Sequence, residues 1–341
     1  MSKTIFGLSA ALVTPYTASG AVELPKLARH AGAMLARGCD SVTLCGTTGE
    51  GYGLSLQERK AMYHAVAGTL PTDTRIQVGI MASAIDDAVA QSRAALDAGA
   101  AGLLMAPPFY LKGVDDEGIF SWFNQVFERI GDSLRGVIMY HIPGQTAVAL
   151  SPELIARLRK AWPGVITGIK DSSGDWATAE RYLDNHGDIS VLVGDERLLP
   201  RAMAKGAEGS ICGVANIAPE LLASVIHSGG DGRLVSEIVD LIVANPPYVA
   251  HGDPHLRRDG LPFEPAMALT DGLAGGDGLA CIRAIVGGAR AHLRPRGWLL
   301  LEHGYRQAAA VRALLNREGL AEVASWHDLS KIERVSGGRL H

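Results

Sequence analysis

Short apolar runs alternate with amphipathic stretches from the N-terminus to about residue 230. The runs are "SAALVTP", "SVTLCG", "RIQVGIMA", "GLLMAPP", "GVIMYHI", "ITGIKDS", "SVLVGDE" and "GSICGV". Most of them are separated by segments with helical spacing, such as "ELPKLARHAGAMLARG" and "AIDDAVAQSRAALDAGA". Strand–helix alternation of this kind predicts a parallel sheet that is buried on both faces. Eight such units are the number that closes a (β/α)8 (TIM) barrel, so we expect an α/β barrel over residues 1–235.

A doubly wound open sheet is the alternative that the same alternation permits. Such folds carry a glycine-rich phosphate-binding loop directly after the first strand. The run "SAALVTP" is followed by "YTASGAVELP", which has no such loop. The barrel is therefore favoured.

The pattern changes after residue 230. A strand ("DLIVANP") leads into a long loop rich in proline and glycine, and the remaining elements are two helices and three strands: "GLACIRAIVGGARAHL", "WLLLEHG", "RQAAAVRALLNREG", "EVASW" and "IERVSG". These elements predict a second α/β unit of about four strands over residues 236–341. Gly229, Gly230 and Gly232 mark the boundary, which we place within residues 229–240.

Composition narrows the class of partner. The chain has 341 residues, 47% of them hydrophobic and 20% charged, with a formal net charge of −4. This charge provides no basic field for nucleic acid or for an anionic membrane, so a small molecule is the expected partner. No apolar run reaches the roughly 20 residues of a membrane helix, and the N-terminal run is too short for a signal peptide. Four cysteines lack metal-type or redox-type spacing, which suits free thiols in a cytoplasmic protein: Cys39, Cys45, Cys212 and Cys281.

The candidate chemistry lies where barrel strands end, because active sites of such barrels form at the C-terminal ends of the strands. The second strand ends in "CGTTGEG", where Thr47 and Thr48 lie between glycines. Two hydroxyls and nearby backbone N–H groups could bind a carboxylate or relay a proton. A plain strand-to-helix turn with a capping threonine is the alternative.

Two tyrosines and a lysine end other strands of the predicted barrel. Tyr110 and Tyr140 place phenols there, although a packed aromatic ring with a wet hydroxyl explains either one alone. Lys170 ends the run "ITGIK" and either extends to water or is a desolvated nucleophile. An amine, two phenols and an anion-binding turn on one rim are the groups needed to condense a lysine with a 2-oxo acid.

At these positions the sequence resembles the dihydrodipicolinate synthase/N-acetylneuraminate lyase family over residues 5 to about 235. The matching pieces follow the family's order: "LVTPY", "CGTTGEG", "APPFY", "MYHIPGQT", "GIKDSSGD", "VGDE" and "GSICGVANIAPEL". The resemblance implies a (β/α)8 barrel and a class I lyase or aldolase acting on pyruvate or a related 2-oxo acid. It implies Lys170 as the Schiff-base lysine and Tyr140 as the acid/base phenol. It also implies Thr47 and Tyr110 in the proton relay, Thr47 and Thr48 on the carboxylate, and no cofactor beyond the lysine itself. Members are usually oligomeric, so a homo-oligomer is expected.

Two departures from the family pattern affect the substrate. His141 replaces the asparagine that usually follows the catalytic tyrosine, and it is either a proton donor at the substrate or a hydrogen-bonded structural histidine. Gln145 replaces the arginine by which dihydrodipicolinate synthases hold the carboxylate of their second substrate. A neutral amide cannot form that bidentate, charge-assisted contact. We therefore expect an aldolase, hydratase or deaminase of 2-oxo acids rather than a true dihydrodipicolinate synthase.

The second unit contains "DLIVANPPYVA". Asn-Pro-Pro-Tyr after an apolar strand is typical of amino methyltransferases, and residues 240–341 resemble the C-terminal half of the release-factor glutamine methyltransferases. The resemblance implies a partial Rossmann-like methyltransferase unit with Asn245, Pro246 and Tyr248 at its substrate site. His251 and His255 lie in a loop similar to that family's ordinary loop, so no metal site is expected there.

The cofactor-binding half of such a methyltransferase is missing from the sequence. S-adenosylmethionine requires a glycine-rich loop after the first strand of that fold, and residues 215–240 do not supply one. The chain therefore resembles a chimera of a barrel and the back half of another enzyme. A Schiff-base lyase is the leading interpretation; a glutamine N-methyltransferase and an inactive fusion are the alternatives. We also expect "DLIVANP" to have an unpaired edge and the C-terminal unit to be less stable than the barrel.

Overall fold

The computed structural model describes residues 5–230, 239–257, 269–270, 276–328 and 331–341. The chain divides into two compact units, Met1–Val235 and Ser236–His341. The boundary predicted between residues 235 and 236 falls within 231–238, outside the described residues.

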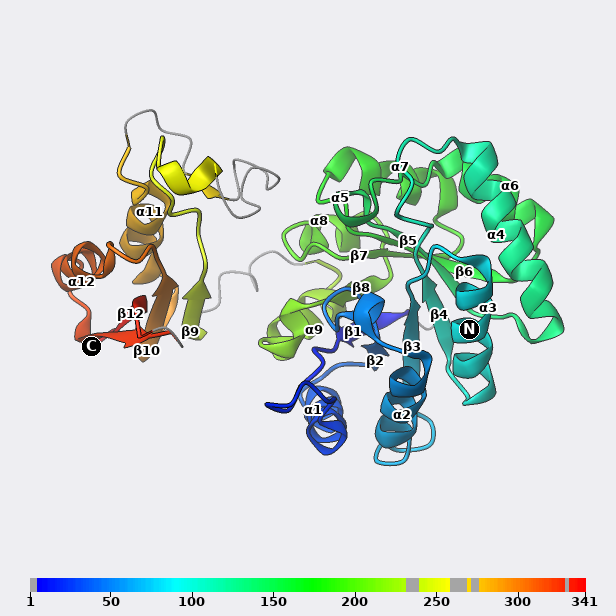
Figure 1. Ribbon diagram of the computed structural model, residues 1–341, viewed down its shortest axis with the longest axis horizontal. Coiled ribbons are helices and arrows are strands. Elements are labelled where there is room, and N and C mark those ends of the chain that lie inside the picture. Colours follow the sequence, from blue (N-terminus) through cyan, green and yellow to red (C-terminus); the bar gives the residue numbers. More distant parts are fainter. Residues whose placement is uncertain (1–4, 231–238, 258–268, 271–275, 329–330) are drawn as a thin grey trace. The chain divides into compact units, whose positions relative to one another are not determined.

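The first unit is a closed barrel of eight parallel strands, so the predicted TIM barrel is confirmed (Figure 1). Each strand pairs with the next along the chain, and β1 closes the ring by pairing with β8. The strands are β1 (Gly7–Ala11), β2 (Ser41–Leu44), β3 (Arg75–Ile80), β4 (Gly102–Met105), β5 (Val137–His141), β6 (Ile166–Asp171), β7 (Ser190–Val193) and β8 (Gly209–Cys212). The predicted runs extend past the C-terminal ends of these strands, because their last residues turn into the loops at the barrel mouth.

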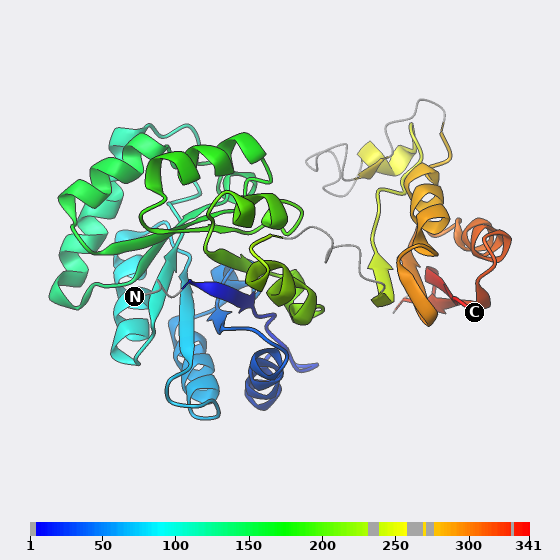
Figure 2. The ribbon, with the colours of Figure 1, turned by 180° about the vertical axis from the view of Figure 1, so that it is seen from behind.

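Helices surround the barrel on all sides (Figures 1 and 2). They are α1 (Leu24–Ala36), α2 (Leu56–Ala67), α3 (Ile85–Asp97), α4 (Asp116–Ile130), α5 (Pro143–Thr146), α6 (Pro152–Ala161), α7 (Trp176–His186), α8 (Leu199–Ala204) and α9 (Pro219–His227). Local sequence explains where several begin. A reciprocal capping box between Ser55 and Glu58 starts α2, and a proline in the first turn starts α6 and α9.

The barrel has two apolar layers because alternate residues of a strand face opposite sides of the sheet. Outward-facing residues such as Leu8 and Val42 pack with the helices in one large cluster. The other strand positions, among them Leu104, Ile138 and Ile211, form a smaller cluster inside the ring. Tyr140 belongs to this inner cluster, so its side chain points into the barrel.

The second unit contains a four-stranded sheet in the order β11-β12-β10-β9. Its elements are β9 (Val239–Ala244), α11 (Ala280–Ala289), β10 (Leu293–Glu302), α12 (Ala308–Arg317), β11 (Ala321–His327) and β12 (Glu333–Arg339). All four predicted strands and both predicted helices are present. β10 begins earlier than its predicted run, and α11 ends earlier, because Leu293 pairs with β9 rather than continuing the helix. A separate apolar core unites the sheet with both helices.

The β9 strand forms one end of this sheet. It pairs with β10, and no other described strand pairs with it, which agrees with the predicted open edge. Ile242 and Ala244 pack on the core, whereas Leu241 and Val243 are 45% and 63% exposed. The strand thus has an apolar outer face as well as an open edge. None of the helices in the described segments has the length and apolar composition of a membrane span.

Candidate active site

Lys170 and Tyr140 lie side by side at the C-terminal ends of neighbouring strands. The register pairs Tyr140 of β5 with Lys170 of β6, so both side chains point into the barrel. Lys170 is only 5% exposed, and its Nζ lies 4.2 Å from the centre of the Tyr140 ring. An amine is therefore held inside the mouth of the barrel against a phenol.

Thr47 completes a contact across the barrel mouth. Its Oγ1 lies 3.1 Å from the Tyr140 hydroxyl, which makes a hydrogen bond between the β2 and β5 ends. Burial raises the pKa of Tyr140, but the Lys170 charge and hydrogen bonds from Thr47, Lys170 and Ser172 outweigh it, so this pKa is lowered overall. A phenol with a lowered pKa exchanges protons more readily near neutral pH. Three of the residues predicted to share one rim, Lys170, Tyr140 and Thr47, therefore lie together in one cluster.

The turn that carries Thr47 has an unusual backbone. Cys45 and Glu50 both adopt the left-handed conformation, with φ of 55° at each. The Gly49 carbonyl accepts a hydrogen bond from the Thr14 hydroxyl at 2.6 Å, which anchors the turn to the loop after β1. Thr48 is exposed and lies against Gly213 at the end of β8. Both threonines therefore border the mouth, as a carboxylate-binding role requires.

Gly194, at the end of β7, is a site residue that the sequence reasoning did not single out. A Cβ at this position would lie 2.0 Å from Ser172 Oγ and 3.0 Å from Lys170 Cε. The lysine and the serine therefore occupy the space that any side chain here would take. The motif "VGDE" contained this glycine, but its contact with Lys170 depends on the pairing of β6 with β7.

A groove lies beside the lysine. It has a volume of about 430 Å³ and is lined by Ser172, Ser173, Gly174, Gly194, Asp195, Glu196 and Arg197. Arg197 is paired with Asp195, since its guanidinium donates to both oxygens of that carboxylate. Hydroxyls and carboxylates therefore dominate the lining, and these groups bind hydroxyl or ammonium donors.

Tyr110 does not reach the cluster within this single chain, and its predicted role in the proton relay stays a prediction. It lies in the loop after β4 and is 83% exposed. The contact between Thr47 and Tyr140 forms without it. A loop position could not be oriented from the strand pattern, and the strand ends at Met105, several residues earlier.

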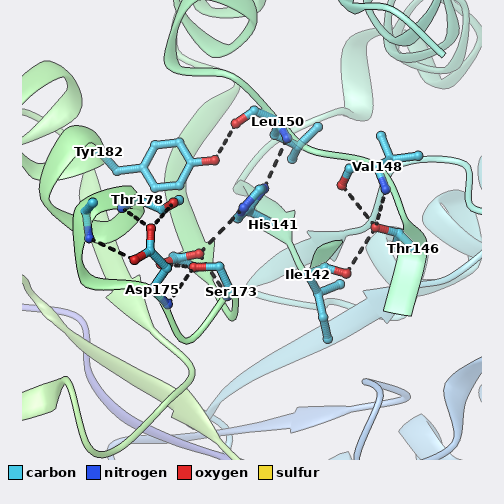
Figure 3. A network of polar contacts seen from close by, with 11 residues as sticks. His141, Ile142, Thr146, Val148, Leu150, Ser173, Asp175, Thr178 and Tyr182 are labelled. Carbon is cyan, nitrogen blue, oxygen red and sulfur yellow. Dashed lines mark hydrogen bonds and ion pairs between the residues drawn. The ribbon is translucent and has the colours of Figure 1, made fainter. Parts of the chain in front are cut away.

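His141 lies outside the cluster as well, which favours its interpretation as a structural histidine. It follows Tyr140 on β5 and therefore points to the opposite side of the sheet. Its Nδ1 accepts a hydrogen bond from the Leu150 N–H at 3.0 Å, and its ring packs edge-on against Tyr182 at 5.6 Å (Figure 3). Burial lowers the pKa of His141 to about 4, so the ring is neutral near pH 7.

Asp171 lies beside His141 on this outer side of the barrel. The His141 Nε2 is 3.9 Å from its carboxylate, which accepts hydrogen bonds from the Ser173 N–H and hydroxyl. Burial raises the pKa of Asp171 to about 6, although the Ser173 bonds oppose the shift. The pKa of Asp171 therefore lies above the usual range of a carboxyl group but below 7.

Gln145, the remaining barrel position predicted to contact substrate, lies in α5 and is exposed. Its side chain carries no charge, so this segment offers no cation for a second carboxylate. In the second unit, a separate cavity of about 610 Å³ has Asn245, Pro246 and Tyr248 in its lining. The Tyr248 hydroxyl donates to Glu302 at 3.0 Å and accepts from Arg334 at 2.8 Å. The described residues contain no group of three or more metal-type side chains.

Comparison with known proteins decides the family. A model of the dihydrodipicolinate synthetase family matches residues 4–239. The chain belongs to this family. Its barrel is thus the barrel of a family of lyases and aldolases.

Individual relatives of the barrel agree with this assignment. An uncharacterised DapA-like lyase of Chloroflexus aurantiacus is 33% identical over 229 residues, covering 66% of this chain and 76% of the relative. The crystal structure of dihydrodipicolinate synthase from Agrobacterium tumefaciens has a TM-score of 0.65 and 46% identity, covering 68% of this chain and 81% of that one. The crystal structure of a chloride-inhibited dihydrodipicolinate synthase from Acinetobacter baumannii, complexed with pyruvate, has a TM-score of 0.62 and 31% identity. The match covers 67% of this chain and 78% of that one.

A relative of another kind also matches. The release factor glutamine methyltransferase of Xylella fastidiosa is 42% identical over 172 residues, which cover 48% of this chain. The chain spans 62% of that methyltransferase, which is less than two thirds of its length.

Proposed function

We propose that the barrel is a class I lyase or aldolase that forms a Schiff base between Lys170 and the C2 carbonyl of pyruvate or a related 2-oxo acid. The observation that carries the proposal is the contact of the buried Lys170 amine with Tyr140, whose hydroxyl lies 3.1 Å from Thr47. Membership of the dihydrodipicolinate synthetase family supports it. The pyruvate in the Acinetobacter baumannii complex supports this substrate class.

The proposed reaction assigns a role to each of these groups. The uncharged Lys170 amine attacks C2, and a C–N bond forms as the carbonyl oxygen takes a proton from the Tyr140 phenol. The nitrogen gives up a proton, the hydroxyl leaves as water with one further proton, and an iminium remains. Thr47 and Tyr140 pass these protons along their hydrogen bond, while Thr47 and Thr48 hold the carboxylate. Removal of a proton from C3 then gives the enamine that makes or breaks a bond.

The rest of the substrate would occupy the groove lined by Ser172, Asp195 and Glu196. Its hydroxyls and the Glu196 carboxylate suit a chain that carries hydroxyl or ammonium groups, and the Arg197 guanidinium in the same lining is already paired with Asp195. Gln145 offers no charge to a second carboxylate either. We therefore propose a 2-oxo acid with one carboxylate and a polar tail rather than the substrates of a true dihydrodipicolinate synthase.

Borohydride reduction with pyruvate tests the proposal. It should leave a reduced adduct on Lys170, located by peptide mass spectrometry. The Lys170→Met variant should lose the adduct, whereas Lys160→Met, which removes an exposed lysine on α6, should keep it. Equal labelling of wild type and Lys170→Met would exclude this lysine as the nucleophile.

We further propose that the lysine needs no cofactor, that the protein acts in the cytoplasm, and that its copies associate. Association would cover large apolar side chains on the surface of the barrel, including Leu111, which is 70% exposed, and Tyr52, which is 67% exposed. Light scattering of the purified protein would test association.

A second candidate function concerns the C-terminal unit alone. Its cavity, lined by Asn245 and Tyr248, and its partial match to release-factor glutamine methyltransferases support a methyltransferase-like segment. We propose that it does not bind S-adenosylmethionine, because the sequence lacks that fold's glycine-rich half. Saturable binding of this cofactor in calorimetry would overturn the proposal.

A further inference from the structure

Arg59, in the first turns of α2, is a buried cation that the proposed reaction does not use. It is 5% exposed, and no carboxylate among the described residues is paired with it. Its guanidinium donates instead to three backbone carbonyls, those of Gly51, Gly79 and Leu54. Burial of a charge without an opposite charge is unfavourable, so this arrangement calls for a specific cause.

Two of these carbonyls belong to glycines that enclose the turn of Thr47. A Cβ at Gly51 would lie 1.8 Å from the Cys45 carbonyl oxygen, and a Cβ at Gly79 would lie 2.3 Å from the same atom. The backbone of the turn therefore packs directly on the backbone of β3, with no side chain between them. Arg59 donates to both glycines, at 2.8 Å in the case of Gly79, and so joins the turn to the strand.

Hydrogen bonds within the turn connect Gly51 to the segment that carries Thr47. The Gly51 N–H donates to the Gly46 carbonyl at 2.9 Å, and the Glu50 N–H donates to the Thr47 carbonyl at 3.0 Å. Fixing Gly51 consequently fixes the loop from Gly46 to Glu50, in which the two threonine hydroxyls lie. The guanidinium also places a positive charge beneath this loop, where no described carboxylate neutralises it.

We propose that Arg59 is a positioning residue for the carboxylate of the 2-oxo acid. It holds the turn of Thr47 and Thr48 in its binding conformation and contributes a favourable potential to the anion. The proposal rests on the proposed function, since it assumes that this turn binds the substrate carboxylate. A purely structural arginine is the alternative, and it would affect every carbonyl compound alike.

Two probes separate these roles: pyruvate, and pyruvamide, in which a neutral amide replaces the carboxylate. The variants are Arg59→Lys, which keeps the charge but cannot reach three carbonyls, and Arg59→Met, which removes the charge. Arg93→Met is the matched control, because Arg93 is an exposed arginine on the adjacent helix α3. The concentration of each probe that gives half-maximal borohydride trapping on Lys170 is measured, with circular dichroism as the check on folding.

For pyruvate we expect this concentration to rise about tenfold or more in Arg59→Met and by a smaller factor in Arg59→Lys. Pyruvamide should show a much smaller increase than pyruvate in both Arg59 variants, because the Thr47 turn still serves its proton transfers but holds no carboxylate, and Arg93→Met should match wild type with both probes. An unchanged half-maximal concentration of pyruvate in the Arg59 variants, or an equal increase for pyruvate and pyruvamide, would overturn the proposal. If Arg59→Met does not fold, Arg59→Lys decides between these outcomes. Absence of any adduct in wild type would overturn the proposed function itself and, with it, this inference.

Discussion

The two units of this chain differ in how the strands of their sheets are paired. In the barrel, every strand has two neighbours, since β8 pairs with β1, and the ring has no edge. In the C-terminal unit, β9 has one partner among the described strands and exposes Leu241 and Val243. Open apolar edges favour association with other strands, whereas closed rings do not.

The two candidate sites also differ in the kind of sheet that supports them. The Lys170 cluster draws its residues from β2, β5 and β6 and their loops, all of which lie within the closed ring. The cavity of Asn245 and Tyr248 depends on a sheet that ends at β9. We therefore expect catalysis by the barrel to survive damage to the C-terminal unit, and the following changes test this expectation.

Gly194→Ala should have the largest effect on the barrel. Its new Cβ would overlap Ser172 Oγ and crowd Lys170 Cε at 3.0 Å, so the serine hydroxyl has to rotate and the amine has to shift relative to Tyr140. We expect the rate of pyruvate trapping to fall on the order of 100-fold, the loss typical of a misplaced reactive group. Gly144→Ala is the control, because a Cβ there meets nothing within 4 Å. Normal trapping by Gly194→Ala would contradict the positions given for this cluster.

Leu299→Ala should have the largest effect on the C-terminal unit. Leu299 is fully buried in β10, at the centre of the sheet. Removing its side chain should lower the free energy of unfolding of this unit by about 2–5 kcal/mol. The measurement is differential scanning calorimetry together with pyruvate trapping, which should be unchanged. Val243→Ala, on the exposed face of β9, should alter stability by less than about 0.5 kcal/mol. Loss of trapping in Leu299→Ala would show that the units depend on each other.

Asp171→Asn should change how the stability of the barrel depends on pH. Burial raises the folded-state pKa of Asp171 from 3.8 to about 6, so its ionisation destabilises the barrel as pH rises from 4 to 6. The pKa of His141 falls from 6.5 to about 4, so protonation of this ring destabilises the barrel as pH falls from 6.5 to 4. The two contributions oppose each other in wild type.

Without Asp171 the histidine contribution alone should remain. The midpoint of urea unfolding of the Asp171→Asn barrel should therefore rise with pH between 4 and 6.5 more steeply than that of wild type. His141→Gln should give the opposite slope. Parallel curves for the three proteins would contradict the pKa values assigned to this pair.

Gly288→Ala should give a small effect, and a favourable one. Gly288 lies in the exposed part of α11, and a Cβ there meets nothing within 4 Å. Alanine should stabilise the C-terminal unit by about 0.5–1 kcal/mol through helix propensity. The calorimetric transition of this unit should move upward while that of the barrel stays fixed. Gly278→Ala, at φ +74° and with its Cβ 2.3 Å from the Tyr248 carbonyl, should destabilise the same unit.

The elements were largely predictable because each kind of burial leaves its own pattern in the sequence. Strands buried on both faces appear as short apolar runs, and every predicted run corresponds to a strand. The period of two along β5 also separates Tyr140 from His141, although both are candidate site residues by their positions in the sequence. Once Tyr140 points inward, its neighbour has to point outward toward Tyr182.

The hydrophobic pattern of the sequence could not predict where the side chains of Tyr110 and Arg59 lie. Tyr110 lies in an irregular loop, whose direction depends on tertiary contacts rather than on residue spacing. Arg59 is one charged residue on a helix, which normally indicates a solvated face. Its burial follows from the approach of the turn to β3, a contact between residues that no local spacing relates.

Closure of the barrel also bears on the order in which the chain folds during synthesis. The last strand of the ring ends at Cys212, and α9 ends at His227, before any element of the second unit begins. Every strand partner of Lys170 has therefore left the ribosome while the C-terminal unit is still being translated. We expect the nascent barrel to fold first, so that the segment that follows can be exchanged, lengthened or cut without changing how the ring assembles.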